Sequence, residues 1–80
     1  QRRGKAKKRV FPFRTENILN NQDDIIFIEK KVGTVIKTID DIGIALVRIE
    51  VIEDLISQSE KIIIGNNPCK IEFFYPQGYL

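Results

Sequence analysis

The sequence of 80 residues contains no histidine, methionine or tryptophan, and its only cysteine is Cys69. One cysteine cannot form an internal disulfide, and it fits a reducing compartment. Without histidine, the chain cannot by itself build a zinc site of the usual Cys/His kinds. It also lacks the side chain that most often transfers protons near neutral pH. We therefore do not expect an enzyme that acts through this chain alone.

Long hydrophobic runs are also missing. The longest continuous run of apolar residues and glycine, residues 42–47, is far shorter than the roughly 18–20 residues that cross a membrane. The basic start is not followed by the apolar segment of a secretory signal, so we predict no membrane partner. The first residue is not Met, which we interpret as a piece cut from a longer protein. Isoleucine occurs fifteen times; we take this as AT-rich codon usage, which favours the bacterial cytoplasm, with the mitochondrial matrix as the alternative.

Basic residues are concentrated at the start of the chain. Six of the thirteen lie in residues 1–9, namely Arg2, Arg3, Lys5, Lys7, Lys8 and Arg9. Residues 10–80 hold seven basic and eleven acidic groups, a net charge of −4. We predict a basic connector arm, residues 1–9, joined to a mildly acidic domain, residues 10–80. The arm could neutralise phosphates of a nucleic acid, or it could be a solvated connector or a contact to another domain.

Beyond the arm, short β-type segments alternate with turn signals. Pro12 marks an edge or entry strand, and helical spacing of Ile49, Ile52, Leu55 and Ile56 predicts one short amphipathic helix. The expected strands cover residues 10–13, 25–29, 32–39, 42–48, 61–64 and 70–75. This pattern predicts an all-β fold, a small six-stranded antiparallel barrel with one short helix, because closure removes exposed strand edges.

Two turns bear on the details of this barrel. The residues Asp40-Asp41 separate two β-type runs, which predicts either a two-residue hairpin or a bulged connection ending at Gly43. The stretch of residues 65–68 predicts a turn before the last strand. We expect Gly33 and Gly43 to permit a bulge or bend and not to cradle a phosphate.

Few side chains suggest site chemistry. Cys69 could lend a thiolate to a shared metal, but we predict a small, partly buried apolar residue. The pairs Asp23-Asp24 and Asp40-Asp41 resemble parts of a cation site, yet both fall in expected turns, where Asp bonds the backbone. Arg48 is expected at a solvated strand end. We predict no catalytic residue and no metal ligand.

Two phenylalanines follow the arm. Phe11 and Phe13 flank Pro12, and this pattern fits a buried strand better than a platform for stacking bases.

Several short motifs occur in the order seen in one family. Gln1, Arg3, Gly4 and the pair Lys8-Arg9 match a basic run that precedes a first barrel strand, here residues 10–14. Residues 32–35 (VGTV) and 43–48 (GIALVR) match two later motifs. The chain thereby resembles the C-terminal part of YgfZ-type folate-binding proteins, relatives of the glycine-cleavage T-protein that include CAF17-like iron–sulfur cluster assembly factors. Arg2 stands where that family often has histidine.

The resemblance implies a Greek-key barrel like that of the T-protein, an aminomethyltransferase. It implies an accessory domain, non-catalytic alone, in a protein that supports assembly or maintenance of 4Fe–4S clusters and is linked to tRNA modification. Tetrahydrofolate would be bound by upstream domains of the same protein, and iron–sulfur assembly proteins would be partners. The family's signature cysteine would lie before residue 1, so no catalytic or folate-binding residue is assigned here.

Two other functions stay open at this point. One is a small RNA-binding barrel that uses the basic residues 2–9, and the other is an enzyme acting on its own, for which the composition offers little material.

Overall fold

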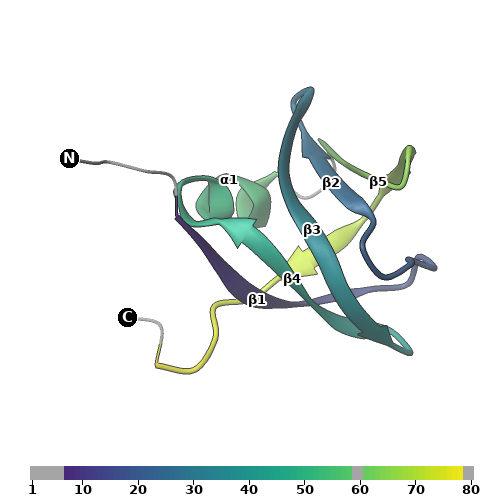
Figure 1. Cartoon of the computed structure of the whole chain (residues 1–80), viewed down its shortest axis with the longest axis horizontal. Coiled ribbons are helices and arrows are strands. Elements are labelled where there is room, and N and C mark those ends of the chain that lie inside the picture. Colours follow the sequence, from purple (N-terminus) through teal and green to yellow (C-terminus); the bar gives the residue numbers. More distant parts are fainter. Residues whose placement is uncertain (1–6, 59–60, 79–80) are drawn as a thin grey trace.

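The computed structural model describes residues 7–58 and 61–78. Within them, seven strands form one antiparallel sheet in the order β6-β5-β2-β3-β4-β1-β7, which curls into a nearly closed barrel beside one short helix (Figure 1). The strands are β1 (Lys8–Thr15), β2 (Asp24–Phe27), β3 (Lys30–Ile39), β4 (Ile42–Arg48), β5 (Ile62–Ile64), β6 (Asn67–Cys69) and β7 (Ile71–Phe73). The predicted all-β barrel is confirmed.

The strand count of six is wrong, because the turn before the last strand is shorter than expected. Only Gly65 and Asn66 form it, with φ angles of 61° and 68°. Positive φ at both positions matches the twist of a hairpin and lets Asn67–Cys69 pair with β5 as β6. Pro68 lies opposite Ile63 on this edge strand, a position where a missing N–H is tolerated.

The turn between β2 and β3 also lies earlier than the sequence suggested. Ile28 and Glu29 have φ angles of 50° and 64° and join the paired residues Phe27 and Lys30. The expected strand over residues 25–29 therefore ends at Phe27. At the next hairpin, Ile39 pairs with Ile42 across Asp40-Asp41, so the two-residue connection is correct and the bulge ending at Gly43 is not.

The strand order contains a Greek key. The hairpins β2–β3 and β3–β4 follow one another, and β1, which precedes them in sequence, lies beside β4. The two outer strands of the sheet, β6 and β7, are separated in sequence by Lys70 alone. The chain therefore passes directly from one edge of the sheet to the other, and this crossing draws the barrel together.

The core lies inside the barrel, where alternate residues of each strand point. It contains four rings, Phe11, Phe13, Phe27 and Phe73, and aliphatic residues from β2, β3, β4, β5 and β7, while β6 contributes Cys69. A 3-10 turn η1 (Ile49–Val51) leads into helix α1 (Ile52–Ser57), so the predicted helix is confirmed with its first turn tightened. α1 buries Ile52 and Leu55 against the barrel.

Candidate functional site

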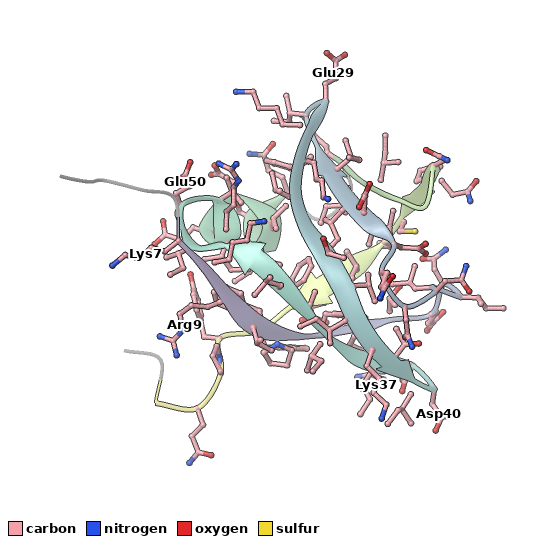
Figure 2. The ribbon with its side chains drawn as sticks, in the orientation of Figure 1. Lys7, Arg9, Glu29, Lys37, Asp40 and Glu50 are labelled. Atoms are coloured by element: carbon pink, nitrogen blue, oxygen red, sulfur yellow. The ribbon has the colours of Figure 1, made fainter. Side chains whose placement is uncertain are left out.

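The basic residues at the start of β1 form one end of the barrel surface. Arg2, Arg3 and Lys5 lie outside the described residues. Lys7, Lys8 and Arg9 are exposed, and Lys7 and Arg9 lie at the same end of the molecule as Glu50 (Figure 2). We call the group Lys7, Lys8, Arg9 and Arg48 the basic end.

The last residues of the predicted arm are held by the barrel. β1 begins at Lys8, two residues before the expected strand, and the Lys7 carbonyl accepts a hydrogen bond from the Ile49 N–H at 2.9 Å. Lys8 lies directly opposite Arg48, and the carboxylate of Glu50 is 3.9 Å from the Arg48 guanidinium. Like charges directly opposite on neighbouring strands repel, so this end favours an anionic neighbour.

An apolar surface lies on the outside of β1 and β4. Val10 pairs with Leu46 and Pro12 pairs with Ile44. Their side chains point away from the core, because their neighbours in sequence point inward. We call the six residues Val10, Pro12, Ile42, Ile44, Leu46 and Phe74 the β4 face. Four of them are 38–56 % exposed, which is high for large apolar side chains.

The β4 face includes a groove of about 380 Å³, lined by Pro12, Ile42, Ile44 and Phe74 among others. The sequence reading did not identify this surface. One feature of the sequence could have indicated this surface. Residues 42–47 are apolar or glycine at every position, whereas apolar and polar residues alternate in a strand with one solvated face.

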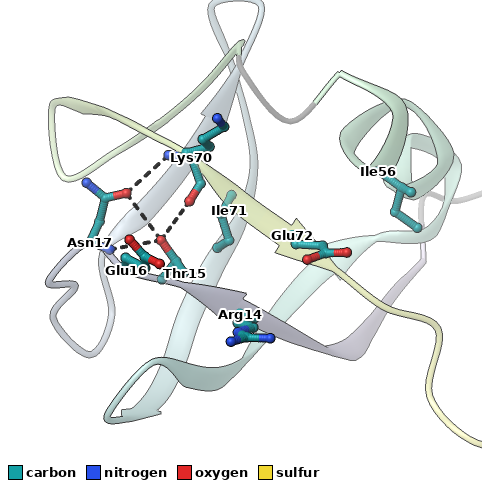
Figure 3. A pocket seen from close by; sticks show the side chains of 8 residues that line it. All are labelled: Arg14, Thr15, Glu16, Asn17, Ile56, Lys70, Ile71 and Glu72. Atoms are coloured by element: carbon teal, nitrogen blue, oxygen red, sulfur yellow. Dashed lines mark hydrogen bonds between the residues drawn. The ribbon is translucent and has the colours of Figure 1, made fainter.

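A second groove, of about 780 Å³, runs over the ends of β1 and β7 beside α1 (Figure 3). Thr15 is 6 % exposed, and its hydroxyl donates to the Lys70 carbonyl at 2.8 Å and accepts from the Asn17 N–H at 3.1 Å. The Asn17 carbonyl Oδ1 in turn accepts from the Lys70 N–H at 3.2 Å. These bonds fix both backbone groups of the residue that crosses between the sheet edges.

The charges along this polar groove are of both signs. Arg14 and Lys70 are cationic, Glu16 and Glu72 are anionic, and Arg14 also lies 3.4 Å from the Asp41 carboxylate. The groove is therefore a structural network with an ordinary charged surface. The sequence predicted Arg14 and residues 70–72 in strands and Ile56 in the helix, but it assigned none of the lining residues to a site.

Cys69 is buried, at 6 % exposure, which confirms the predicted apolar role. Its sulfur lies 3.9 Å from the Ile64 carbonyl and 3.5 Å from the Asn67 carbonyl. Burial raises the pKa of the thiol, and the negative charge of Asp23 adds to the rise while the Ile64 contact opposes it. The neutral thiol is favoured, which suits packing and not nucleophilic attack.

The acidic pairs serve turns and surface ion pairs. The Asp23 carboxylate accepts from the Asn20 N–H at 2.9 Å, and Asp40 adopts a left-handed φ of 56°. Asp24 lies 3.2 Å from the Lys31 ammonium. No cluster of three or more metal-ligating side chains occurs in the described part of the chain.

Two further predictions are tested by the structure. Phe11 and Phe13 are buried, at 0 % and 2 % exposure, and so are core residues and not a base-stacking platform. The Arg48 side chain is 40 % exposed at the end of β4, as expected for a solvated strand end. Over residues 7–58 and 61–78, no helix has the length and apolar character needed to span a membrane.

Comparison with known proteins gives a family match. Residues 7–73 match the family described as CAF17, C-terminal beta-barrel domain. The chain belongs to this family. No curated protein and no solved structure matches the chain.

The CAF17 match and the barrel have nearly the same limits. The matched region begins at Lys7, one residue before β1, and ends at Phe73, the last residue of β7. The chain is therefore a CAF17-type C-terminal barrel within the iron–sulfur cluster assembly family, and the basic end and most of the β4 face lie inside the matched region.

Proposed function

We propose that this chain is the accessory C-terminal barrel of a folate-binding protein of the YgfZ type, and that this protein supports assembly or maintenance of 4Fe–4S clusters. The observation that carries the proposal is the family match, which covers the barrel from its first strand to its last. The motif matches at Gln1, Arg3 and Gly4 support it from the other side, because they extend the resemblance ahead of the barrel.

In this proposal the barrel does no chemistry alone. The chain has no histidine, and its one thiol is buried, which favours the neutral form of that thiol. Tetrahydrofolate is bound by the upstream domains of the same protein, as in aminomethyltransferase relatives, and iron–sulfur assembly proteins are the external partners. The protein acts in the bacterial cytoplasm or, in a eukaryotic cell, in the mitochondrial matrix, and enzymes of tRNA modification that hold 4Fe–4S clusters are among those it serves.

Deleting the barrel from the full-length gene tests this function. Enzymes that need a 4Fe–4S cluster should lose activity in such cells, enzymes without a cluster should keep theirs, and the intact gene should restore the lost activity. Full activity of the cluster enzymes in the deletion strain would refute the proposal.

The exposed basic end favours a second candidate, an RNA-binding barrel. Transfer RNA should then bind the 80-residue chain with an affinity that falls steeply with salt, because phosphate contacts release counterions. Changing the six basic residues of 2–9 to alanine should abolish binding, whereas Lys30→Ala and Lys37→Ala, at exposed sites away from the arm, should not. Binding that ignores both the salt and the arm would exclude this candidate.

A further inference from the structure

The β4 face has the character of an interface. We propose that it is the surface on which this barrel docks against the preceding domains of its own protein, and that the surface it meets is apolar with an acidic border. The inference rests on the proposed function, since it takes the barrel to be one domain of a larger protein. The family's description as a C-terminal domain agrees, because other domains precede a C-terminal one.

Strand β4 is apolar on both of its sides. Ala45 and Val47 point into the core and are fully buried, whereas Ile42, Ile44 and Leu46 point outward. An antiparallel sheet that faces water on one side normally carries polar residues there, and a strand covered on both sides does not. This inner strand of the sheet is thus built for cover on its outer side, which the described residues do not supply.

The neighbours of β4 extend the same surface. Val10 and Pro12 of β1 lie directly opposite Leu46 and Ile44, and Phe74 borders the 380 Å³ groove. Contiguous apolar surface of this kind marks interaction sites, whereas single exposed apolar residues do not. Ile63, 40 % exposed on β5, lies opposite Ile26 and Pro68 and is outside this surface, because β2 and β3 separate β5 from β4 in the sheet order.

The direction of the chain identifies the occupant. β1 supplies part of the β4 face, and the chain enters β1 at the basic end through Lys7 and Lys8. Whatever precedes this domain is therefore joined covalently to the strand that carries part of the face. This tether gives the preceding domains a higher effective concentration at the face than a second copy of the chain has in dilute solution.

Charge specifies the border of the partner surface. At the basic end, Lys8 and Arg48 flank the apolar rows, and the Glu50 carboxylate lies 3.9 Å from the Arg48 guanidinium. At the other end, Arg14 pairs with Asp41, and Lys37 and Asp40 add one charge of each sign. Among the described residues at these two ends, the basic end has the excess of one sign, so the acidic border of the partner should face Lys8 and Arg48.

Hydroxyl-radical footprinting of the full-length protein, compared with the 80-residue chain, tests the docking directly. Labelling of Ile44, Leu46 and Phe74 should fall several-fold in the full-length protein, while labelling of Ile63 should not change. Equal labelling of the β4 face in both proteins would overturn the proposal. Protection of the isolated chain that grows with its concentration would also overturn it, since a second copy would then be the occupant.

Two matched variants of the full-length protein give a second measurement. Ile44→Asp places a charge on the β4 face, and Ile63→Asp places the same charge at a site of similar exposure elsewhere, 38 % against 40 %. In calorimetry, Ile44→Asp should separate the barrel's unfolding from that of the preceding domains, whereas Ile63→Asp should leave their unfolding coupled. Circular dichroism of the same substitutions in the 80-residue chain checks that both barrels fold.

The two proposals can fail separately. If the barrel docks through the β4 face but its deletion has no effect on cluster enzymes, the proposed function is refuted and the proposed interface is not. Loss of cluster-enzyme activity on deletion, with an unprotected β4 face, would refute the interface alone. Lys8→Glu with Arg48→Glu should weaken docking in the same calorimetric measurement, and unchanged coupling would remove the acidic border from the proposal.

Discussion

The ring of Phe13 occupies the space that a side chain at position 43 would need. Phe13 and Gly43 are directly opposite in the β1–β4 ladder, and a Cβ built on Gly43 would lie 2.6 Å from Cζ of Phe13. Gly43 follows the β3–β4 hairpin, where β4 begins, so the ring fits against the backbone of the neighbouring strand. The lack of a side chain at Gly43 is one reason why the Phe13 ring can pack between the paired strands β1 and β4 and the core.

Gly43→Ala should destabilise the barrel by about 1–3 kcal/mol, the usual cost of adding volume to a packed core. Urea unfolding measures the change. In a Phe13→Leu background the same substitution should cost less, because the shorter side chain leaves room, although the Lys37 carbonyl still crowds position 43. Equal costs in both backgrounds would show that the ring is not the obstacle.

The Thr15 hydroxyl should be the most sensitive polar group of the barrel. Thr15→Val keeps the shape but leaves the Lys70 carbonyl and the Asn17 N–H without their partner, and loss of buried hydrogen bonds of this kind costs about 1–3 kcal/mol. Thr15→Ser keeps the hydroxyl and should cost less. Urea midpoints compare the two, and equal losses would mean that the methyl group, not the hydroxyl, matters.

Substitution of the turn residues Ile28 and Glu29 should stabilise the barrel. Both residues have positive φ, which side chains such as Ile disfavour by roughly 1–3 kcal/mol each, and Ile28 is also 61 % exposed. Replacing the pair by Asn-Gly, the preferred residues for this turn, should raise the free energy of unfolding. The control is Ile63→Asn, an exposed strand position without positive φ, which should bring no gain.

Burial of Cys69 should make the stability of the barrel fall at high pH. The folded pKa of this thiol is raised above its ordinary value of 9.0 by burial, with Asp23 adding to the shift. Below pH 9 both states hold the proton and the contribution is fully present. As the pH rises through 9 toward the folded pKa, the unfolded chain ionises first and stability is lost.

The difference between wild type and Cys69→Ala isolates this effect, because the other titrating groups are shared. The variant loses packing at every pH and should be less stable than the wild type. This gap in the free energy of unfolding should become smaller above pH 9, because only the wild type loses the contribution of the thiol. A gap that is constant with pH would show that the thiol has the same pKa in both states.

The sequence determined the class of this protein. Alternation of apolar residues, Gly-Asn and Asp-Asp turns and a short helical period were enough to predict an all-β barrel with one helix. The burial of Phe11, Phe13 and Cys69 followed from the same pattern. These features depend on residues close together in the chain, so local propensity and period report them.

The tertiary structure decided what depends on distant residues. Positive φ at Ile28 and Glu29 contradicts their propensity, and the pairing of the strands around them imposes it. Thr15 and Lys70 are 55 residues apart in sequence and meet only because the chain crosses between β6 and β7. The β4 face likewise exists only once β1 lies beside β4. A pattern along the chain gives each strand two faces, and only the pairing of strands shows which apolar side is left outside the core.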